Sequence, residues 1–199
     1  MRFVPHEYQR YCTEYIKTHS IAALFLDMGL GKTVITLSAI KDLMLETFEV
    51  SKVLIIAPLR VARDTWPAEL EKWDHLKGLD ISVIVGDVKT RIAAVHHPAM
   101  IYIVNRENIK WLVEYYEKNG MRWDFGMVVI DELSSFKNYQ SHRECEIRGT
   151  GQPCCDCCWK NTVKYMIFDF HKFPSKYQQH MSSESRYQQQ RQRTSNRKT

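Results

Sequence analysis

Residues 21–40 read IAALFLDMGLGKTVITLSAI, and this stretch decides the fold class. It joins a short apolar run, typical of a strand buried on both faces, to a run with helical spacing. The turn between them ends in GKT (residues 31–33), the last three elements of the phosphate-loop pattern GxxxxGK[ST]. The first glycine of that pattern is replaced by Leu26, and Gly29 adds flexibility inside the loop instead. The alternative is a plain glycine turn between a strand and a helix.

A phosphate-binding loop uses glycines so that successive backbone N–H groups can point at phosphate oxygens. It also uses the partial positive charge of the helix N-terminus behind the loop. In this interpretation Gly29 and Gly31 hold the phosphates of a nucleotide, and Lys32 reaches the β- and γ-phosphates. The Thr33 hydroxyl would then coordinate Mg²⁺.

The rest of the N-terminal part alternates apolar runs with helical patterns. Pro67 falls in the first turn of one helical pattern, and Thr65 is a candidate cap for it. Strands that alternate with helices predict an α/β fold, a parallel sheet with helices on both faces. The expected strands are residues 21–27, 53–58, 81–86, 100–105 and 127–132, and the expected helices are residues 32–46, 65–73, 91–97 and 107–118.

The last expected strand runs into two acids, Asp131 and Glu132. Ligands of parallel sheets bind beyond the carboxyl ends of the strands, so these acids and the glycine loop can meet in space. A phosphoryl-transfer site needs a carboxylate for Mg²⁺ and a base that orients water. We assign Asp131 to the metal and Glu132 to the water. A solvated acid pair is the alternative, and the loop upstream makes it the weaker one.

Charge and cysteine divide the chain into two compositions near residue 144. Residues 1–143 carry equal numbers of basic and acidic side chains, so the whole net charge of +5 lies in residues 144–199. Five of the six cysteines lie there as well. We therefore expect one domain over residues 1–143, which contains the glycine loop, and a separate tail over residues 144–199, Cys-rich and then basic. The chain contains no apolar run of membrane-spanning length and no secretory signal, which makes the cytoplasm the expected location.

Five motifs together resemble the first motor domain of superfamily-two helicases, specifically the Swi/Snf-like ATPases and their phage and prophage branch. The resemblance extends from Phe3 to Asn138. The order and spacing of the five motifs are more specific for this family than any single motif is. The motifs are FVPHEYQ (3–9), DMGLGKT (27–33), LIIAPLRVARDTW (54–66), IVNREN (103–108) and VVIDELSSFKN (128–138).

The resemblance implies a RecA-like P-loop NTPase fold, ATP and Mg²⁺ as cofactors, and duplex DNA as the partner. It implies that Gln9 selects adenine and that Arg60 contacts a DNA backbone phosphate. It also implies that a residue other than glycine is tolerated at Leu26. Lys32, Asp131 and Glu132 would be the catalytic residues. The oligomeric state does not follow from the resemblance.

The sequence departs from the family pattern in two places, at Ser134 and after Arg143. Ser134 stands where the family has a histidine or similar residue that couples the nucleotide to the nucleic-acid site. After Arg143 the family continues into a second motor domain that supplies an arginine finger. The sequence turns instead into ECEIRGTGQPCCDCCWKN (144–161). We therefore expect an incomplete motor domain that binds ATP weakly and hydrolyses it slowly.

The tail has several interpretations. One is a zinc knuckle built from the pairs Cys154/Cys157 and Cys155/Cys158, completed by Cys145, His171 or His180. A basic arm for nucleic acid (residues 186–198) and a disordered tail are others. The interpretation we prefer is a shift of reading frame near residues 143–145.

Two other functions are compatible with parts of the sequence. A non-catalytic adaptor would use the Cys-rich basic tail to bind nucleic acid or a protein partner. A small nucleotide kinase would share the phosphate loop, but it needs a lid and an acceptor site, and the sequence indicates neither.

Overall fold

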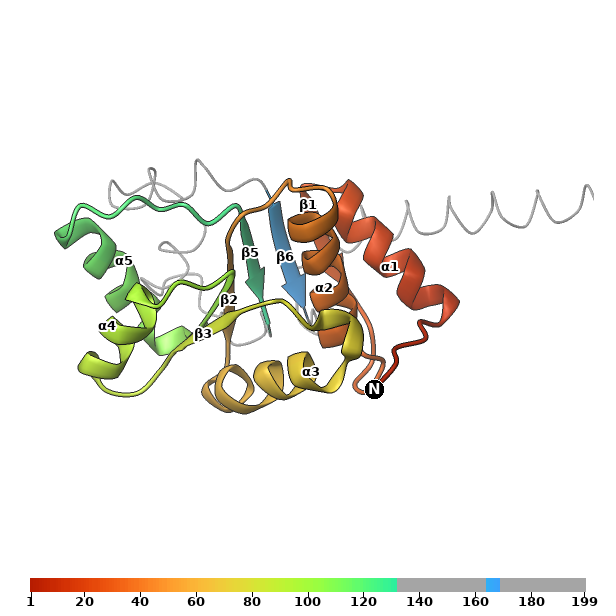
Figure 1. The fold of residues 1–199 in the computed structure, drawn as a ribbon, viewed down its shortest axis with the longest axis horizontal. Helices are drawn as coiled ribbons and strands as arrows, with labels where there is room; N and C mark the ends of the chain where they lie inside the picture. Colours follow the sequence, from red (N-terminus) through yellow and green to blue (C-terminus); the bar gives the residue numbers. More distant parts are fainter. Residues whose placement is uncertain (132–163, 169–199) are drawn as a thin grey trace, which may run out of the picture. The chain divides into compact units, whose positions relative to one another are not determined.

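A parallel β-sheet forms the centre of the computed structural model, which describes residues 1–131 and 164–168 (Figure 1). In this part of the chain the sheet has six strands in the order β1-β6-β5-β2-β4-β3. All of the pairings are parallel. The strands are β1 (Ile21–Leu24), β2 (Val53–Ala57), β3 (Ile81–Ile84), β4 (Ile101–Asn105), β5 (Met127–Ile130) and β6 (Lys164–Phe168).

The central strands form where the sequence is continuously apolar and rich in β-branched residues. Every residue of β2, β4 and β5 is buried, as expected for strands covered on both faces. One helix precedes the first strand, and each of the others follows a strand and returns the chain for the next parallel strand. The helices are α1 (Glu7–Thr18), α2 (Lys32–Lys41), α3 (Trp66–Lys72), α4 (Val88–His96) and α5 (Ile109–Lys118).

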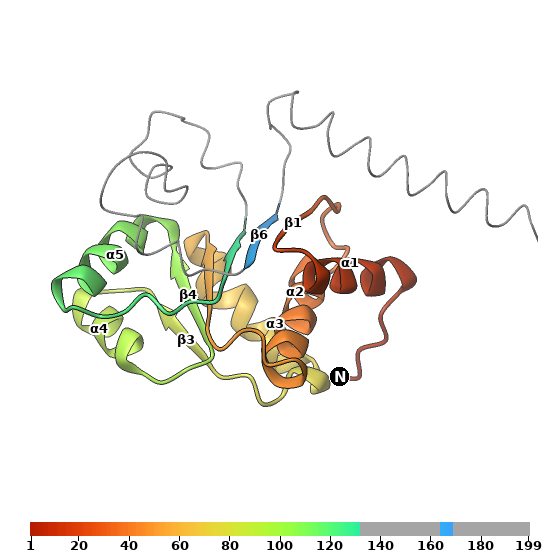
Figure 2. The same cartoon turned by 90° about the horizontal axis from the view of Figure 1, so that it is seen from above.

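The helices divide between the two faces of the sheet, and each face has its own apolar core. Ile55 of β2 packs in the core that includes residues of α1, α2 and α3. Its neighbours Leu54 and Ile56 pack in the core under α4 and α5. This alternation follows from the two-residue repeat of a strand. Figure 2 shows α4 and α5 on one side of the sheet and α1 and α2 on the other. The predicted α/β fold with helices on both faces is confirmed.

The register of the strands sets where the site lies. Ile130 of β5 is opposite Ile167 of β6, and Ile167 is opposite Ala23 of β1. Residue 131 therefore follows β5 at the level where β1 reaches its last residue, Leu24. The glycine loop and Asp131 consequently lie at the same edge of the sheet, with one strand between them.

Several elements differ from the sequence-based expectation. Helix α1 was not expected, and the helix after the glycine loop ends as a π-helical turn, Asp42–Glu46. The prediction that Thr65 caps a helix is wrong. Thr65 ends a π-helical turn, Val61–Thr65, and has helical backbone angles, because this turn runs directly into α3. Strand β6 comes from the stretch that composition assigned to a separate tail, and it pairs with both β1 and β5.

The helices in the described part of the chain are short. None of those in residues 1–131 is long and apolar enough to cross a membrane.

Candidate nucleotide-binding site

The loop between β1 and α2 is shaped by two glycines. Gly29 has φ of 84° and Gly31 has φ of 78°, a left-handed conformation that side chains disfavour. Between them the Leu30 N–H approaches the Asp27 carbonyl oxygen at 3.4 Å. Helix α2 starts at Lys32, and the Ile35 N–H donates to the Gly31 carbonyl at 3.0 Å. The backbone N–H groups of the first turn therefore have no partner within the helix, as an anion-binding helix start requires.

The side chain of Lys32 folds back onto this loop. Its Nζ donates to the carbonyl oxygen of Leu26 at 2.7 Å and approaches that of Asp27 at 3.4 Å. Thr33 is the next residue of α2 and is half-buried. The ammonium group is thus held at the loop by carbonyl oxygens, which a phosphate could replace as its partners.

Gln9 connects helix α1 to the loop. Its side chain is 6% exposed, and Oε1 accepts a hydrogen bond from the His6 N–H at 2.9 Å. Its Nε2 donates to the Leu30 carbonyl at 3.3 Å. A Cβ atom built on Gly31 would lie 2.9 Å from this Nε2, so the amide rests directly on the loop. An amide group has two donor hydrogens and two acceptor lone pairs, and Gln9 can therefore keep these bonds and still pair with an adenine edge.

Asp131 is held by its backbone and by its side chain. Its N–H donates to the Ile56 carbonyl at 2.8 Å, which extends the pairing of β5 with β2 by one residue. Its Oδ2 accepts a hydrogen bond from Trp66 Nε1 at 3.1 Å. Neighbouring strands lie about 4.8 Å apart, so β1 and β5 are separated by about 10 Å across β6. Glu132, expected to orient water, lies outside the described residues.

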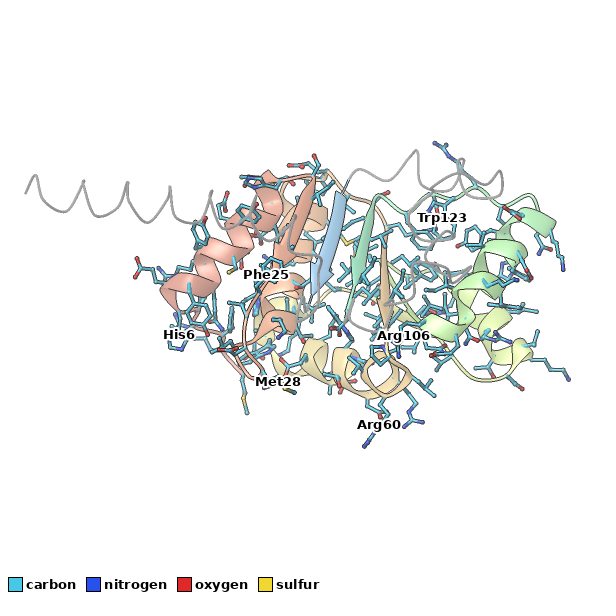
Figure 3. The ribbon with its side chains drawn as sticks, turned by 180° about the vertical axis from the view of Figure 1, so that it is seen from behind. His6, Phe25, Met28, Arg60, Arg106 and Trp123 are labelled. Carbon is cyan, nitrogen blue, oxygen red and sulfur yellow. The ribbon has the colours of Figure 1, made fainter. Side chains whose placement is uncertain are left out.

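Arg60 lies at the carboxyl edge of the sheet, after β2, and is exposed. Figure 3 shows Arg60 and Met28 at one edge of the molecule, with Trp123, which precedes β5, toward the opposite edge. Nearby Arg63 donates to both carboxylate oxygens of Asp64, at 2.8 and 3.0 Å. This hydrogen-bonded pairing lowers the pKa of Asp64. Among the described residues Arg60 is in no ion pair, which leaves its guanidinium available to another anion.

The family model of the SNF2-related domain matches residues 8–149, more than two thirds of the chain. The chain belongs to the SNF2-related domain family. Protein p41 of Acyrthosiphon pisum secondary endosymbiont phage 1 is 37% identical over 139 residues. That alignment covers 69% of this chain and 30% of the phage protein. The chain thus spans less than a third of the length of that relative.

Solved structures with the same fold include helicases and SNF2 ATPases. The Sulfolobus solfataricus SWI2/SNF2 ATPase core in complex with dsDNA has a TM-score of 0.59 at 23% identity, covering 81% of this chain and 31% of that one. The UvsW helicase of bacteriophage T4 has a TM-score of 0.61 at 18% identity, covering 84% and 52%. The DEAD-box helicase Mss116 bound to ssRNA and UDP-BeF has a TM-score of 0.63 at 20% identity, covering 87% and 36%. These similarities support the RecA-like fold of the SNF2-related domain.

Two side chains of this SNF2-related domain contact the glycine loop or Asp131 although sequence reasoning did not single them out. Tyr8 donates from its hydroxyl to the Leu30 carbonyl at 3.2 Å. Trp66 donates to Asp131 across 65 residues of sequence. Tyr8 is adjacent in sequence to Gln9, and this position could have indicated a contact with the glycine loop. No local pattern indicates the Trp66 contact, because it depends on how α3 packs.

The interpretations of the tail lie outside the described residues. They include the zinc ligands Cys145, Cys154, Cys155, Cys157, Cys158, His171 and His180, the basic arm, and the shift of reading frame. Ser134 lies outside them too. Within residues 1–131 the structure contains no cluster of three or more His, Cys, Asp or Glu side chains that could hold a metal ion.

Proposed function

We propose that this SNF2-related domain is the ATP-binding motor domain of a DNA-dependent, helicase-like ATPase. One observation carries the proposal. The loop of Gly29 and Gly31, which opens onto the start of α2, shares an edge of the sheet with Asp131. A loop for phosphates and a carboxylate one strand away are the two parts that a P-loop NTPase needs.

The adenine and the phosphates would be bound by residues that already contact one another. Gln9 is the proposed adenine-selecting residue, and its amide is hydrogen-bonded to the loop at Leu30. Gly29, Gly31 and Lys32 are the proposed phosphate-binding residues. Lys32 would exchange its two carbonyl partners for phosphate oxygens, which form stronger, charge-assisted hydrogen bonds. Base and phosphate recognition would thus be linked through one short loop.

Mg²⁺ fits the oxygen-bearing side chains at this edge. The Thr33 hydroxyl and the Asp131 carboxylate are the hard oxygen donors that Mg²⁺ prefers, and we propose them as its protein ligands. When bound, the ion would neutralise charge on the β- and γ-phosphates. Glu132, directly after Asp131 in the sequence, is the proposed base that orients water.

Duplex DNA is the proposed partner, with Arg60 on its phosphate backbone. Residues 1–143 have no net charge, so attraction to DNA must come from local groups and not from the overall field. Arg60 is such a group, because it is exposed at the edge where ligands bind and forms no ion pair within residues 1–131.

Nucleotide binding is the decisive measurement. Turnover is the poorer readout, since an arginine finger, which the family carries on its second motor domain, contributes roughly 10³–10⁵ in rate in related phosphoryl transfer. Titration of a fluorescent ATP analogue in the presence of Mg²⁺ should give saturable binding. Lys32→Ala should weaken it by roughly 10- to 100-fold, since a hydrogen bond to a charged group contributes about 1.5–3 kcal/mol.

Lys41→Ala is the matched control for Lys32→Ala. Lys41 is a lysine at the other end of α2 and pairs with Glu46 at 2.6 Å. This variant should bind the analogue within about twofold of the wild type, because an exposed pair contributes little. Equal affinity in the wild type and in Lys32→Ala would refute the proposed function.

A further inference from the structure

Trp66 makes a contact that the proposed reaction does not yet account for. Its side chain is 1% exposed at the start of α3, and its Nε1 donates to Asp131 Oδ2 at 3.1 Å. Figure 1 shows α3 beyond the arrowhead of β5, beside the end of the strand that leads to Asp131. The contact therefore joins the first residue of a helix to the first residue after a strand.

The packing of the Trp66 ring does not explain why its N–H donates to Asp131. The indole ring fills the core under α3, and a phenyl ring could fill much of the same space. Its N–H is a donor only, and a buried indole N–H needs an acceptor. Here the acceptor is the carboxylate at the end of β5.

The bond constrains the orientation of the carboxylate. The backbone of Asp131 is tied to β2 by its N–H to the Ile56 carbonyl at 2.8 Å. With Oδ2 tied to Trp66, the torsions of the side chain are restrained as well, because both ends of the residue are held. Restraining a ligand through a hydrogen bond to one of its atoms is how outer partners tune metal sites, typically by 10- to 100-fold in affinity.

We propose that Trp66 is a positioning residue for Mg²⁺: its indole N–H holds Asp131 so that the carboxylate faces the metal of a bound nucleotide. This inference rests on the proposed function, because it assumes that Asp131 is a magnesium ligand. Trp66 itself touches neither nucleotide nor metal. Its effect is therefore confined to the step in which Mg²⁺ joins the nucleotide on the protein.

A matched pair of tryptophan variants tests the proposal. Trp66→Phe keeps an aromatic ring and removes the N–H. Trp73→Phe does the same one helix length away, where Nε1 donates to Glu69 Oε2 at 2.7 Å. Affinity for the fluorescent ATP analogue is measured in EDTA and over a series of Mg²⁺ concentrations, for the wild type and for both variants.

The expected result is a change in magnesium dependence and not in nucleotide affinity. Trp66→Phe should bind the analogue in EDTA with the affinity of the wild type. The Mg²⁺ concentration that gives half of the magnesium-dependent change in affinity should be about tenfold higher than in the wild type. Trp73→Phe should keep the wild-type magnesium dependence. An unchanged magnesium dependence in Trp66→Phe overturns the role of Trp66 and leaves the proposed function intact. A wild type with no magnesium-dependent binding refutes the proposed function and this inference with it.

A measurement that keeps Trp66 in place covers the case in which Trp66→Phe does not fold. The indole N–H resonance of Trp66 in a ¹⁵N-labelled sample should move upfield in Asp131→Ala, which removes the carboxylate, and should shift when magnesium and the analogue are added together. The Trp73 resonance should stay in place in both experiments. A Trp66 resonance that responds to neither change overturns the proposal.

Discussion

The loop after β1 and the end of β5 lie at the same edge of the sheet, but they are built in different ways. The loop is mainly a backbone structure, set by positive φ angles at Gly29 and Gly31 and by bonds from Lys32 to nearby carbonyls, with Gln9 of α1 resting on it. The end of β5 depends on side chains brought from elsewhere. Asp131 is held by Ile56 of β2 and by Trp66 of α3.

This difference tells which kind of change each region should tolerate. A backbone site depends on torsion angles and on the absence of a Cβ atom, so a single methyl group should damage it. A side-chain site depends on particular donor and acceptor atoms. It should withstand changes of shape that keep those atoms and fail when they are removed.

The largest effect is expected from methyl groups in the loop. Gly29→Ala adds a Cβ with no atom within 4 Å, so its cost is that of the left-handed backbone alone, about 1–2 kcal/mol of unfolding free energy. Gly31→Ala carries the same cost, and its Cβ would lie 2.9 Å from Gln9 Nε2 and 3.1 Å from Val34 Cγ1. Gln9 must then give up its bond to Leu30, which adds roughly 1 kcal/mol. Urea unfolding measures both variants.

A double-mutant cycle separates the cost of the left-handed backbone at position 31 from the cost of displacing Gln9. In a Gln9→Ala background the extra loss at position 31 should shrink by the roughly 1 kcal/mol assigned to the Gln9–Leu30 bond, and only the contact with Val34 should remain. If Gly29→Ala and Gly31→Ala are equally unstable in the wild-type background, the close approach of Gln9 to the loop has no energetic consequence.

Binding of DNA at this edge of the sheet should depend on individual charged side chains. Arg60→Ala should weaken duplex DNA binding and lower the slope of log affinity against log salt by about 1, since one phosphate contact is lost. Arg63→Ala, three residues along, should leave the slope unchanged because Arg63 is engaged with Asp64. Fluorescence anisotropy with a labelled duplex at several salt concentrations measures both. Equal slopes for the two variants would remove Arg60 from the proposed interface.

The smallest effect is expected at His75, which contacts α2, the helix that follows the glycine loop. His75 Nε2 lies 2.8 Å from Ser38 Oγ of α2, and this hydroxyl donates to the Val34 carbonyl. The His75 ring must therefore donate from Nε2, and its buried Nδ1 has no hydrogen-bond partner among the described residues. Burial, and then the charge of Lys41, lower the pKa of His75. Protonation of this ring is thus less favourable in the folded chain than in the unfolded one.

The sign of the pH effect follows from that lowered pKa. At pH values above the unfolded pKa, about 6.5, His75 is neutral in both states and its contact with Ser38 stabilises the fold. As the pH falls below that value and through the folded pKa, the unfolded chain takes up the proton first and stability is lost. His75→Gln can keep a donor toward Ser38, and it should lose less stability than the wild type between about pH 7.5 and about pH 5.5. An equal loss in both proteins would assign the pH dependence to other groups.

Much of the fold and part of the site could be predicted because their signals are local. The apolar runs at residues 53–58 and 100–105 predicted strands, which the structure has as β2 and β4, and the glycine loop marked the start of α2. Helix α1 was missed, since its mainly polar sequence is organised by contacts with α2 and the loop. The boundary proposed near residue 143 came from composition, which does not contain the pairing of β6 with β1 and β5.

The sequence by itself determined the order of β1 to β5 and of the helices between them, the position of the glycine loop and the chemical identity of Lys32, Thr33 and Asp131. These follow from apolar periodicity and from the backbone freedom of glycine, which act over a few residues. Only the tertiary structure decided that Gln9 rests on Gly31 and that Trp66 holds Asp131. Those contacts arise where the faces of α1 and α3 pack against the sheet, and no local pattern specifies which atoms meet there.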